Sequence, residues 1–340
     1  MLTTTLPPMR PEWAVCPNSA CDASRPIGVH SLKERRYKCH ACGKTFAETS
    51  GTPLFGLKHA LWLVLVVLAL LASGCPVPAI VFAFGLDERT VADWQRKAGQ
   101  HAKLVQEHLV CQGAVDLGQV QADELYTKTQ AGPVWIATAM TVFSRLWLWG
   151  TISWQRDTAL IQPVIEHSRA AAQPGRPILF AVDGFKAYVT CILKVFRDPL
   201  HTGRRGRPQL VVWDDLHIVQ VVKQRAGKRL LSITRRLAHG SLAQAEAIMQ
   251  ATQMDVGRIN TASIERLNAT LRTWIPALVR RTRTPSGARL QLEAALFWTG
   301  CVYNFCHVHA TLAGTPAMAA DLTDHVWSID ELIRYRRRRE

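Results

Sequence analysis

The sequence lacks any apolar run long enough to span a membrane. Its most apolar stretch covers residues 61–72, whereas a membrane-spanning helix needs about 20 residues. This stretch therefore predicts one buried helix. The first residues also lack the basic-then-apolar leader and the small-residue cleavage site of a secreted protein. From both absences we expect a cytoplasmic protein with no membrane partner.

Acidic residues are the second shortage. The chain of 340 residues has 26 of them against 41 basic residues, which gives a net charge of +15 at pH 7. This balance favours a polyanionic partner and disfavours acidic small-molecule chemistry alone. A merely basic globular protein is the alternative, because charge alone does not identify a partner.

The nine cysteines do not fit a secreted disulfide framework, because nine is an odd number and no leader precedes them. Four of them form two close pairs, C-x4-C and C-x2-C: Cys16 with Cys21, and Cys39 with Cys42. Four thiolates fill the tetrahedral shell of a structural Zn²⁺, and the close spacing lets each pair bind from one tight turn. Residues 1–52 therefore predict a zinc ribbon. Unrelated free cysteines are the alternative.

Residues 53–112 predict a helical DNA-binding domain. Pro78 can occupy the first turn of a short apolar helix that Gly85 ends, and Asp87 can N-cap the next helix. Two helices around a glycine turn resemble a helix-turn-helix, whose second helix enters the major groove. An ordinary helical hairpin is the alternative. The second helix is expected to bury Val91, Trp94 and Ala98 and to present four side chains to DNA: Arg89, Gln95, Arg96 and Lys97.

Residues 115–310 predict an α/β domain, a mixed sheet with flanking helices. Apolar runs predict strands at 119–126, 134–142, 146–152 and 178–182, and helices at 156–171, 185–196 and 260–274. The first three strands are expected to form a meander, and the fourth is fully apolar, as buried strands are. A stretch rich in Gly, Arg and Pro predicts an exposed loop over 198–208. Residues 311–340 predict a helical segment with a basic tail at 334–339.

Three acidic residues of this domain stand where a sheet could gather them. Asp123 lies in the first strand, Asp183 follows the fourth strand, and Glu265 lies in the last helix. Asn268 and Arg272 share the helix face of Glu265, about 100° from the apolar stripe. Carboxylates are the ligands that Mg²⁺ prefers. Two such ions can activate the attacking oxygen and stabilise the leaving oxygen of a phosphodiester.

Each of these assignments has an alternative. Asp183 could cap the following helix, and the Glu265 pattern could belong to an ordinary surface helix. The rival ligands in the same segment are Asp214, Asp215 and Asp255. Glu124 is expected to point to the sheet face opposite Asp123, because successive strand residues alternate.

Three blocks of this domain resemble the signature blocks of DDE transposases of the insertion sequence 1 type. They are Ala-Asp-Glu-Leu-Tyr at 122–126, Val-Asp-Gly-Phe-Lys-Ala-Tyr at 182–188 and Ile-Glu-Arg-Leu-Asn-Ala-Thr-Leu-Arg at 264–272. The order of zinc ribbon, helix-turn-helix and catalytic domain is similar as well, so the resemblance covers nearly the whole chain. The chain departs from it in the wider first cysteine pair and in the basic loop before Glu265.

The resemblance implies a ribonuclease-H-like fold in which Asp123, Asp183 and Glu265 hold catalytic Mg²⁺ or Mn²⁺. It implies a prokaryotic, nucleoid-associated transposase that assembles as a homodimer or higher homo-oligomer. Its partner would be double-stranded DNA, both the terminal inverted repeats of an insertion sequence and the target. The predicted DNA contacts of this domain are Asn268, Arg272, Arg280, Arg281 and Arg283. A zinc-containing regulator with an inactive catalytic domain, or a structure-selective metal-dependent nuclease, is the alternative.

Overall fold

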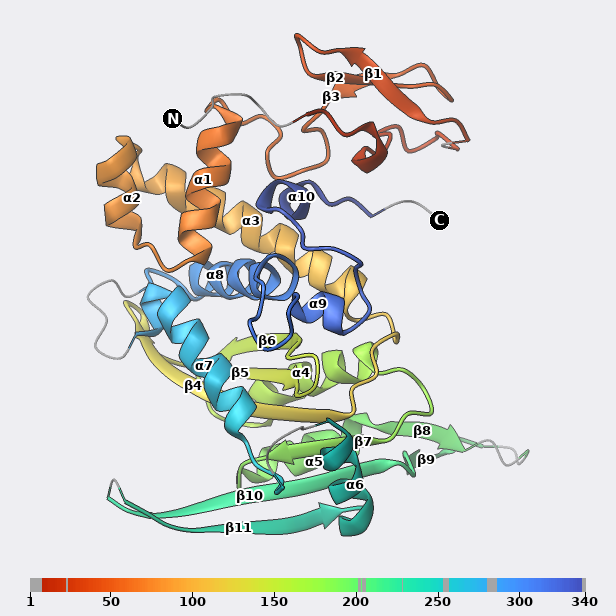
Figure 1. Cartoon of the computed structure of the whole chain (residues 1–340), viewed down its shortest axis with the longest axis vertical. Helices are drawn as coiled ribbons and strands as arrows, with labels where there is room; N and C mark the ends of the chain where they lie inside the picture. Colours follow the sequence, from red (N-terminus) through yellow and green to blue (C-terminus); the bar gives the residue numbers. More distant parts are fainter. Residues whose placement is uncertain are drawn as a thin grey trace.

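The computed structural model describes residues 8–22, 24–200, 203, 206–227, 229–252, 257–279 and 286–337. A six-stranded mixed sheet lies in its lower half, the cysteine-bearing segment lies at the top of Figure 1, and a long hairpin lies at the bottom. Among the described residues, no helix is both long and apolar enough to cross a membrane.

The cysteine-bearing segment forms a small antiparallel sheet after a 3-10 turn. Its elements are η1 (Pro11–Trp13), β1 (Ile27–Ser31), β2 (Arg36–Cys39) and β3 (Thr45–Ala47). Tyr37 and Phe46 pair across β2 and β3, are buried, and have ring centroids 5.9 Å apart. A core this small rarely stabilises a fold alone, so the segment needs a further constraint.

Three helices follow: α1 (Leu61–Ala72), α2 (Val77–Phe84) and α3 (Glu88–Leu109). The predicted helix over 61–72 is confirmed. Gly85 ends α2 in the left-handed conformation, and Asp87 caps α3 by accepting a hydrogen bond from the Arg89 N–H at 2.8 Å. The predicted inward residues of α3, Val91, Trp94 and Ala98, are buried.

α3 packs closely along α8 (Arg289–Cys301). A Cβ atom on Gly99 would lie 2.3 Å from the carbonyl oxygen of Ala294, so only glycine permits this approach. Residues of α1, α2, α3 and α8 belong to the same hydrophobic core as the central sheet. α3 is therefore anchored against the rest of the chain along much of its length.

The central sheet has the strand order β11-β10-β7-β4-β5-β6. Its strands are β4 (Gln119–Thr129), β5 (Gly132–Thr141), β6 (Trp147–Ser153), β7 (Ile178–Val182), β10 (Leu216–Ala226) and β11 (Arg229–His239). β4, β5 and β6 form the expected antiparallel meander, and β7 pairs in parallel with both β4 and β10. The four predicted strands are confirmed, with small shifts at their ends.

Helices cover both faces of this sheet. α4 (Thr158–Ala171) and α5 (Lys186–Val195) lie on one face, whereas α6 (Leu242–Thr252) and α7 (Ala262–Trp274) lie on the other. Phe180 of β7 faces Phe196 at the end of α5, with ring centroids 5.3 Å apart, while Leu179 packs with Met249 of α6. Because β7 is covered on both sides, all of its residues are buried.

The stretch before β10 differs from its prediction. The exposed loop expected over 198–208 begins later, because β8 (Arg197–Leu200) pairs with β9 (Gln209–Val212). Arg204 and Arg205 of this loop lie outside the described residues. The rival ligands Asp214 and Asp215 lie between β9 and β10.

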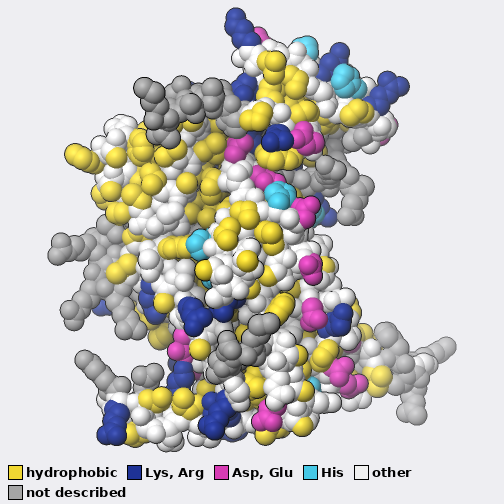
Figure 2. Space-filling model, viewed as in Figure 1, with side chains coloured by type: hydrophobic (Ala, Val, Ile, Leu, Met, Phe, Trp, Pro, Cys, Tyr) yellow, Lys and Arg dark blue, Asp and Glu magenta, His cyan; other side chains and the backbone are white. Residues whose placement is uncertain are grey.

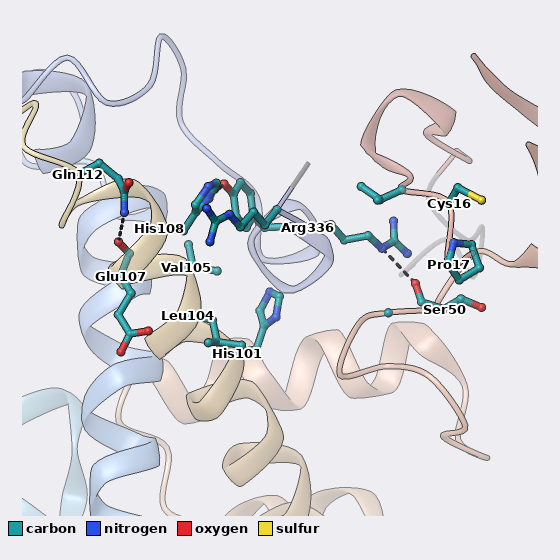
Figure 3. Close-up of a pocket in the computed structure, with 14 residues that line it drawn as sticks. Cys16, Pro17, Ser50, His101, Leu104, Val105, Glu107, His108, Gln112 and Arg336 are labelled. Atoms are coloured by element: carbon teal, nitrogen blue, oxygen red, sulfur yellow. Dashed lines mark hydrogen bonds between the residues drawn. The ribbon is translucent and has the colours of Figure 1, made fainter. Parts of the chain in front are cut away.

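The C-terminal segment returns to the cysteine-bearing segment. After η2 (Pro276–Leu278) and α8 come a π-helical turn, η3 (Val302–Cys306), then α9 (Pro316–Ala319) and α10 (Ile329–Arg334). Arg334 is buried and lies 3.0 Å from Glu48. Arg336 donates a hydrogen bond to the Ser50 carbonyl oxygen at 3.1 Å (Figure 3) and another to the Trp13 carbonyl oxygen at 3.1 Å. The first residues of the predicted basic tail are thus structural contacts of the cysteine-bearing segment.

Candidate metal centres

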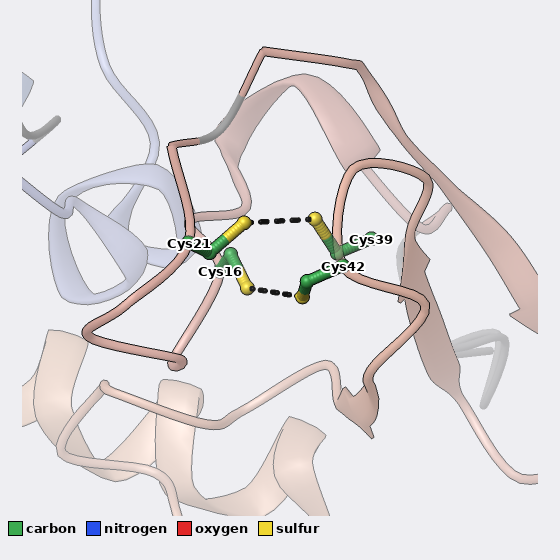
Figure 4. A group of neighbouring side chains, drawn as sticks. All are labelled: Cys16, Cys21, Cys39 and Cys42. Carbon is green, nitrogen blue, oxygen red and sulfur yellow. Dashed lines mark hydrogen bonds between the residues drawn. The ribbon is translucent and has the colours of Figure 1, made fainter.

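The four predicted zinc ligands converge on one point. The Sγ atoms of Cys16, Cys21, Cys39 and Cys42 all lie within 4.8 Å of one another (Figure 4). The sulfurs of Cys16 and Cys42 are 3.6 Å apart, and those of Cys21 and Cys39 are 3.7 Å apart. Zn–S bonds of about 2.3 Å in a tetrahedron separate the sulfurs by about 3.8 Å. This cluster can therefore bind a metal ion with little movement.

The turn after β2 favours the thiolate that a metal requires. Gly43 has a φ of 75°, which glycine adopts without strain, and its N–H donates to the Cys39 carbonyl at 2.8 Å. A hydrogen bond from the Lys44 N–H is the largest cause that lowers the pKa of the Cys42 thiol, to about 6. A backbone N–H aimed at sulfur is typical support for a metal-bound cysteine.

The three predicted catalytic acids line a single cleft of about 570 Å³. Asp123 comes from β4, Asp183 follows β7, and Glu265 comes from the first turn of α7. The other lining residues are Ala122, Arg156, Gly184, Phe185, Val221, Val222, Lys223 and Thr261. The sequence prediction that these acids meet is confirmed to this extent.

Buried amides fix α7 over β4. Gln121 accepts a hydrogen bond from the Ile264 N–H at 2.9 Å and donates to the Asn260 carbonyl at 2.8 Å. Two residues further along β4, Asp123 accepts a hydrogen bond from Asn268 Nδ2 at 2.9 Å. The helix that carries Glu265 is therefore aligned with the strand that carries Asp123.

Asp123 is a partly buried carboxylate. Its burial, followed by the charges of Asp183 and Glu265, raises its pKa to about 6, although Asn268 partly offsets the shift. The raised pKa means that the site stabilises the charged carboxylate poorly unless a cation is near. A pKa shifted in this way within a cleft is a feature of functional carboxylates.

Asp183 stands where the parallel pairing of β7 ends. The last register pair of β4 and β7 joins Ala122 to Val182, so the strands separate at Asp183. Its Oδ1 accepts a hydrogen bond from the Phe185 N–H at 2.8 Å, while its Oδ2 lies 3.2 Å from Arg156 Nη2. Because Phe185 is the N-cap residue of α5, this hydrogen bond also fixes the start of the helix, so Asp183 combines part of the alternative capping role with its place in the cleft.

Glu265 is half exposed at the rim of the cleft. It forms an ion pair with Lys223 of β10, and it accepts a hydrogen bond from Thr261 Oγ1 at 2.9 Å. Lys223 was not among the predicted site residues. It reaches the cleft only because β10 pairs beside β7, a neighbour relation that local sequence does not reveal.

Glu124 approaches the same acids from the sheet face opposite Asp123, as predicted. Asp123 contacts Asn268 of α7, whereas Glu124 lies 3.1 Å from Arg156, which precedes α4 on the other face. One oxygen each of Asp123, Glu124 and Asp183 nevertheless lie within 4.8 Å of one another, because Asp183 follows β7, the strand next to β4. Burial, followed by the charge of Asp183, raises the pKa of Glu124 to about 7, against the opposing effect of Arg156.

Two of the predicted DNA contacts are buried. Gln95 is only 9% exposed and accepts a hydrogen bond from Gln291 Nε2 of α8 at 2.6 Å. The prediction that Gln95 lies outside is therefore wrong, because α8 covers α3 from a direction that the periodicity of α3 does not encode. Asn268 is 2% exposed and donates a hydrogen bond to Asp123.

The remaining predicted DNA contacts are placed as follows. Arg89 is exposed, whereas Arg96 and Lys97 form ion pairs with Asp93 at 2.5 and 2.8 Å. Arg272 lies in the last turn of α7. Arg280, Arg281 and Arg283 lie outside the described residues, as does the rival ligand Asp255. Figure 2 shows further Lys and Arg side chains over the β10–β11 hairpin at the bottom of the view.

Comparison with models of protein families gives no match to this chain, and comparison with curated proteins gives none either. The two centres, and the fold that positions the second one, are therefore the basis for assigning a function.

Proposed function

We propose that the chain is a DNA transposase of the DDE type. The observation that carries the proposal is the single cleft lined by Asp123 of β4, Asp183 at the end of the parallel strand β7, and Glu265 of the covering helix α7. The strand order supports it. An antiparallel meander, β4 to β6, followed by β7 and β10 in parallel beside β4, is the arrangement of a ribonuclease-H-like sheet.

The donor set of the cleft fits a hard divalent cation. Asp123, Asp183 and Glu265 offer only oxygen ligands, and the adjacent Glu124 adds another carboxylate. Mg²⁺ or Mn²⁺ bound there would supply charge stabilisation to the attacking and leaving oxygens. The cysteine cluster, with four sulfurs at tetrahedral spacing, fits Zn²⁺ and would stabilise the small N-terminal sheet as a zinc ribbon.

The reaction proceeds in two displacements at phosphorus. In the first, water attacks the phosphodiester at the end of the element, the bond to the 3′ oxygen breaks, and that oxygen takes a proton. In the second, the freed 3′-hydroxyl attacks a target phosphodiester, loses its proton, and displaces the target's own 3′ oxygen. Asp123 and Asp183 would hold the cations, which would stabilise charge on the reacting phosphate, and Asn268 keeps Asp123 oriented. No protein nucleophile is required.

DNA recognition is assigned to the N-terminal half. Arg89, Arg96 and Lys97 stand on one stretch of α3, the second helix of the proposed helix-turn-helix, and would contact the terminal inverted repeats. Arg272 and the residues Arg280, Arg281 and Arg283 would contact backbone phosphates near the cleft. Pairing of two element ends requires at least a homodimer. The protein would act in a prokaryotic cytoplasm, on the DNA of the nucleoid.

A strand-transfer assay tests this proposal. The donor is duplex DNA with the genomic ends that flank the coding sequence, the target is a plasmid, and Mg²⁺ or Mn²⁺ is supplied. Wild type is compared with Asp183→Asn and Glu265→Gln, which preserve side-chain shape and remove charge. Asp215→Asn is the matched control, because Asp215 follows β9 outside the cleft.

The products separate the three candidate functions. Joined donor and target from wild type and Asp215→Asn, but not from the other two variants, is the result we expect. Cutting without joining or end preference would indicate a nuclease. Specific DNA binding without any cutting under either metal would indicate a regulator with an inactive catalytic domain.

A further inference from the structure

The side chain of Glu124 is far less exposed than those of Asp183 and Glu265. It is 2% exposed, compared with 37% for Asp183 and 50% for Glu265. Its Oε2 lies 3.1 Å from Arg156 Nη2, while its Oε1 is buried and has no hydrogen-bond partner among the described residues. Burying a carboxylate oxygen without a partner costs free energy, and a bound cation usually offsets that cost.

A second buried polar atom lies in the same region. The hydroxyl of Tyr188 is fully buried and also has no hydrogen-bond partner within the described part of the chain. Its pKa is raised above the ordinary value by burial first, and then by the charges of Glu124, Asp123 and Asp183, so it lies near all three carboxylates. Two unpartnered oxygens beside one acidic cluster indicate that the cluster has a polar occupant.

Arg156 contacts two carboxylates and two aromatic rings, so it keeps favourable contacts if the carboxylates bind another cation. Its Nη2 bridges Glu124 and Asp183 at 3.1 and 3.2 Å. Its guanidinium carbon also lies 4.2 Å from the ring centroid of Phe185 and 5.4 Å from that of Trp135. Cation–π contacts with these rings would still stabilise the Arg156 guanidinium after both carboxylate contacts are lost. One arginine also leaves most of the charge of three carboxylates uncompensated.

We propose that Glu124 is a ligand of the divalent cation held by Asp123 and Asp183, and that Arg156 competes with that cation for their oxygens. The inference rests on the proposed function, since it concerns the same cleft, and it adds a fourth carboxylate to the predicted triad. Glu265 then completes the site from the far rim, because it lies outside the cluster that Asp123, Glu124 and Asp183 form among the described residues. Without the ion, Arg156 pairs with Glu124 and Asp183; when the ion binds, it replaces Arg156 at their oxygens.

Two substitutions with opposite expected signs test this inference. Mn²⁺ binding to the zinc-loaded full chain is measured by calorimetry, without DNA and without turnover. Glu124→Gln should weaken Mn²⁺ binding by about tenfold or more, whereas Arg156→Gln should strengthen it by several-fold. If the Glu124–Arg156 ion pair had only a structural role, both substitutions would change Mn²⁺ affinity in the same direction, because each breaks the same contact. That result would overturn the inference.

Controls separate this inference from the proposed function. Glu246→Gln, an exposed position on α6, should leave Mn²⁺ binding unchanged. If Asp123→Asn abolishes binding but Glu124→Gln keeps wild-type affinity, only the inference fails. If wild type binds no Mn²⁺, or Asp123→Asn binds it as wild type does, the proposed metal centre fails as well. Glu124→Asp, which keeps the charge, should show intermediate affinity and reports on Glu124 if the Gln variant does not fold.

Discussion

Asn268 of α7 donates a hydrogen bond from Nδ2 to Oδ2 of Asp123 on β4, at 2.9 Å, and this contact joins the two elements that build the cleft. On its other side, Asn268 Oδ1 accepts a hydrogen bond from Thr138 Oγ1 of β5 at 3.2 Å. The amide is therefore fixed in one orientation, with its donor toward the carboxylate. A residue predicted from its helical face to touch DNA instead positions a proposed metal ligand.

Asn268→Ala should lower both stability and activity. Removing the amide leaves Asp123 and Thr138 without a buried partner, which costs about 1–3 kcal/mol of the free energy of unfolding. Urea denaturation measures that loss, and the strand-transfer rate should fall because Asp123 is no longer oriented. Thr273→Ala, on an exposed part of α7, is the control and should change neither quantity. Wild-type Mn²⁺ affinity and wild-type activity in Asn268→Ala would show that Asp123 needs no positioning.

The raised carboxylate pKa values predict opposite pH trends for stability and for metal binding. The pKa of Asp123 is about 6 and that of Glu124 is about 7, above the ordinary values of about 4. Between about pH 4 and pH 7 the folded chain thus binds more protons than the unfolded chain. The free energy of unfolding should fall as pH rises through this window when the cleft holds no cation. Mn²⁺ affinity should rise, because the ion displaces those protons.

Denaturation at about pH 5 and about pH 8, with and without Mn²⁺, checks both trends. Added Mn²⁺ should restore stability at the higher pH and have little effect at the lower. The double variant Asp123→Asn, Glu124→Gln should show a flatter pH dependence of stability than wild type. An unchanged slope in that variant would assign the titration to groups outside the cleft.

Local pattern was sufficient for the elements that bury a continuous apolar surface. β7 is apolar at every position and central in the sheet, and its predicted and observed ends coincide. α1 likewise matches its predicted bounds. Asp183 could be placed at a sheet edge because it directly follows β7. In each case, the information lies within one short segment of chain.

Residues whose role depends on a distant neighbour could not be found in this way. Glu124 lies close to Asp183 because β7, from a distant part of the chain, pairs beside β4. Gln95 is buried because α8, from a distant part of the chain, lies against α3. Lys223 reaches the cleft through the pairing of β10 with β7. Strand pairing and helix docking are set by long-range packing. Helical and strand periodicity identify a buried face but not the element that packs against it.

The cysteine cluster predicts one tightly bound zinc per chain. Cys39→Ser should abolish it, because Cys39 is fully buried, supplies one of the four sulfurs, and a hydroxyl does not replace a thiolate ligand. Zinc content by atomic absorption should fall from one per chain to none. Near-ultraviolet circular dichroism should show loss of packing around Tyr37. Cys75→Ser, outside the cluster, should retain the metal, and equal loss in both variants would contradict the assignment.

The ion pair between Arg334 and Glu48 predicts that the C-terminal segment holds the cysteine-bearing segment in place. Both side chains are nearly fully buried, 3.0 Å apart, and Glu48 also pairs with Arg35. Arg334→Met leaves part of the Glu48 charge uncompensated in a buried site, which costs about 3 kcal/mol or more. Arg336 would still bind carbonyl oxygens of that segment, so we expect loosening and not release.

Hydrogen exchange is the measurement that resolves this loosening. Amides of β2 and β3 should lose protection in Arg334→Met, while those of β7, which lies in the central sheet, should keep it. Arg337→Met is the matched control, because Arg337 is exposed and lies three residues further along the same segment. Equal protection of β2 and β3 in the two variants would mean that the small sheet is held by its own metal and core alone. Selective loss in Arg334→Met would show that the C-terminal segment stabilises the cysteine-bearing segment.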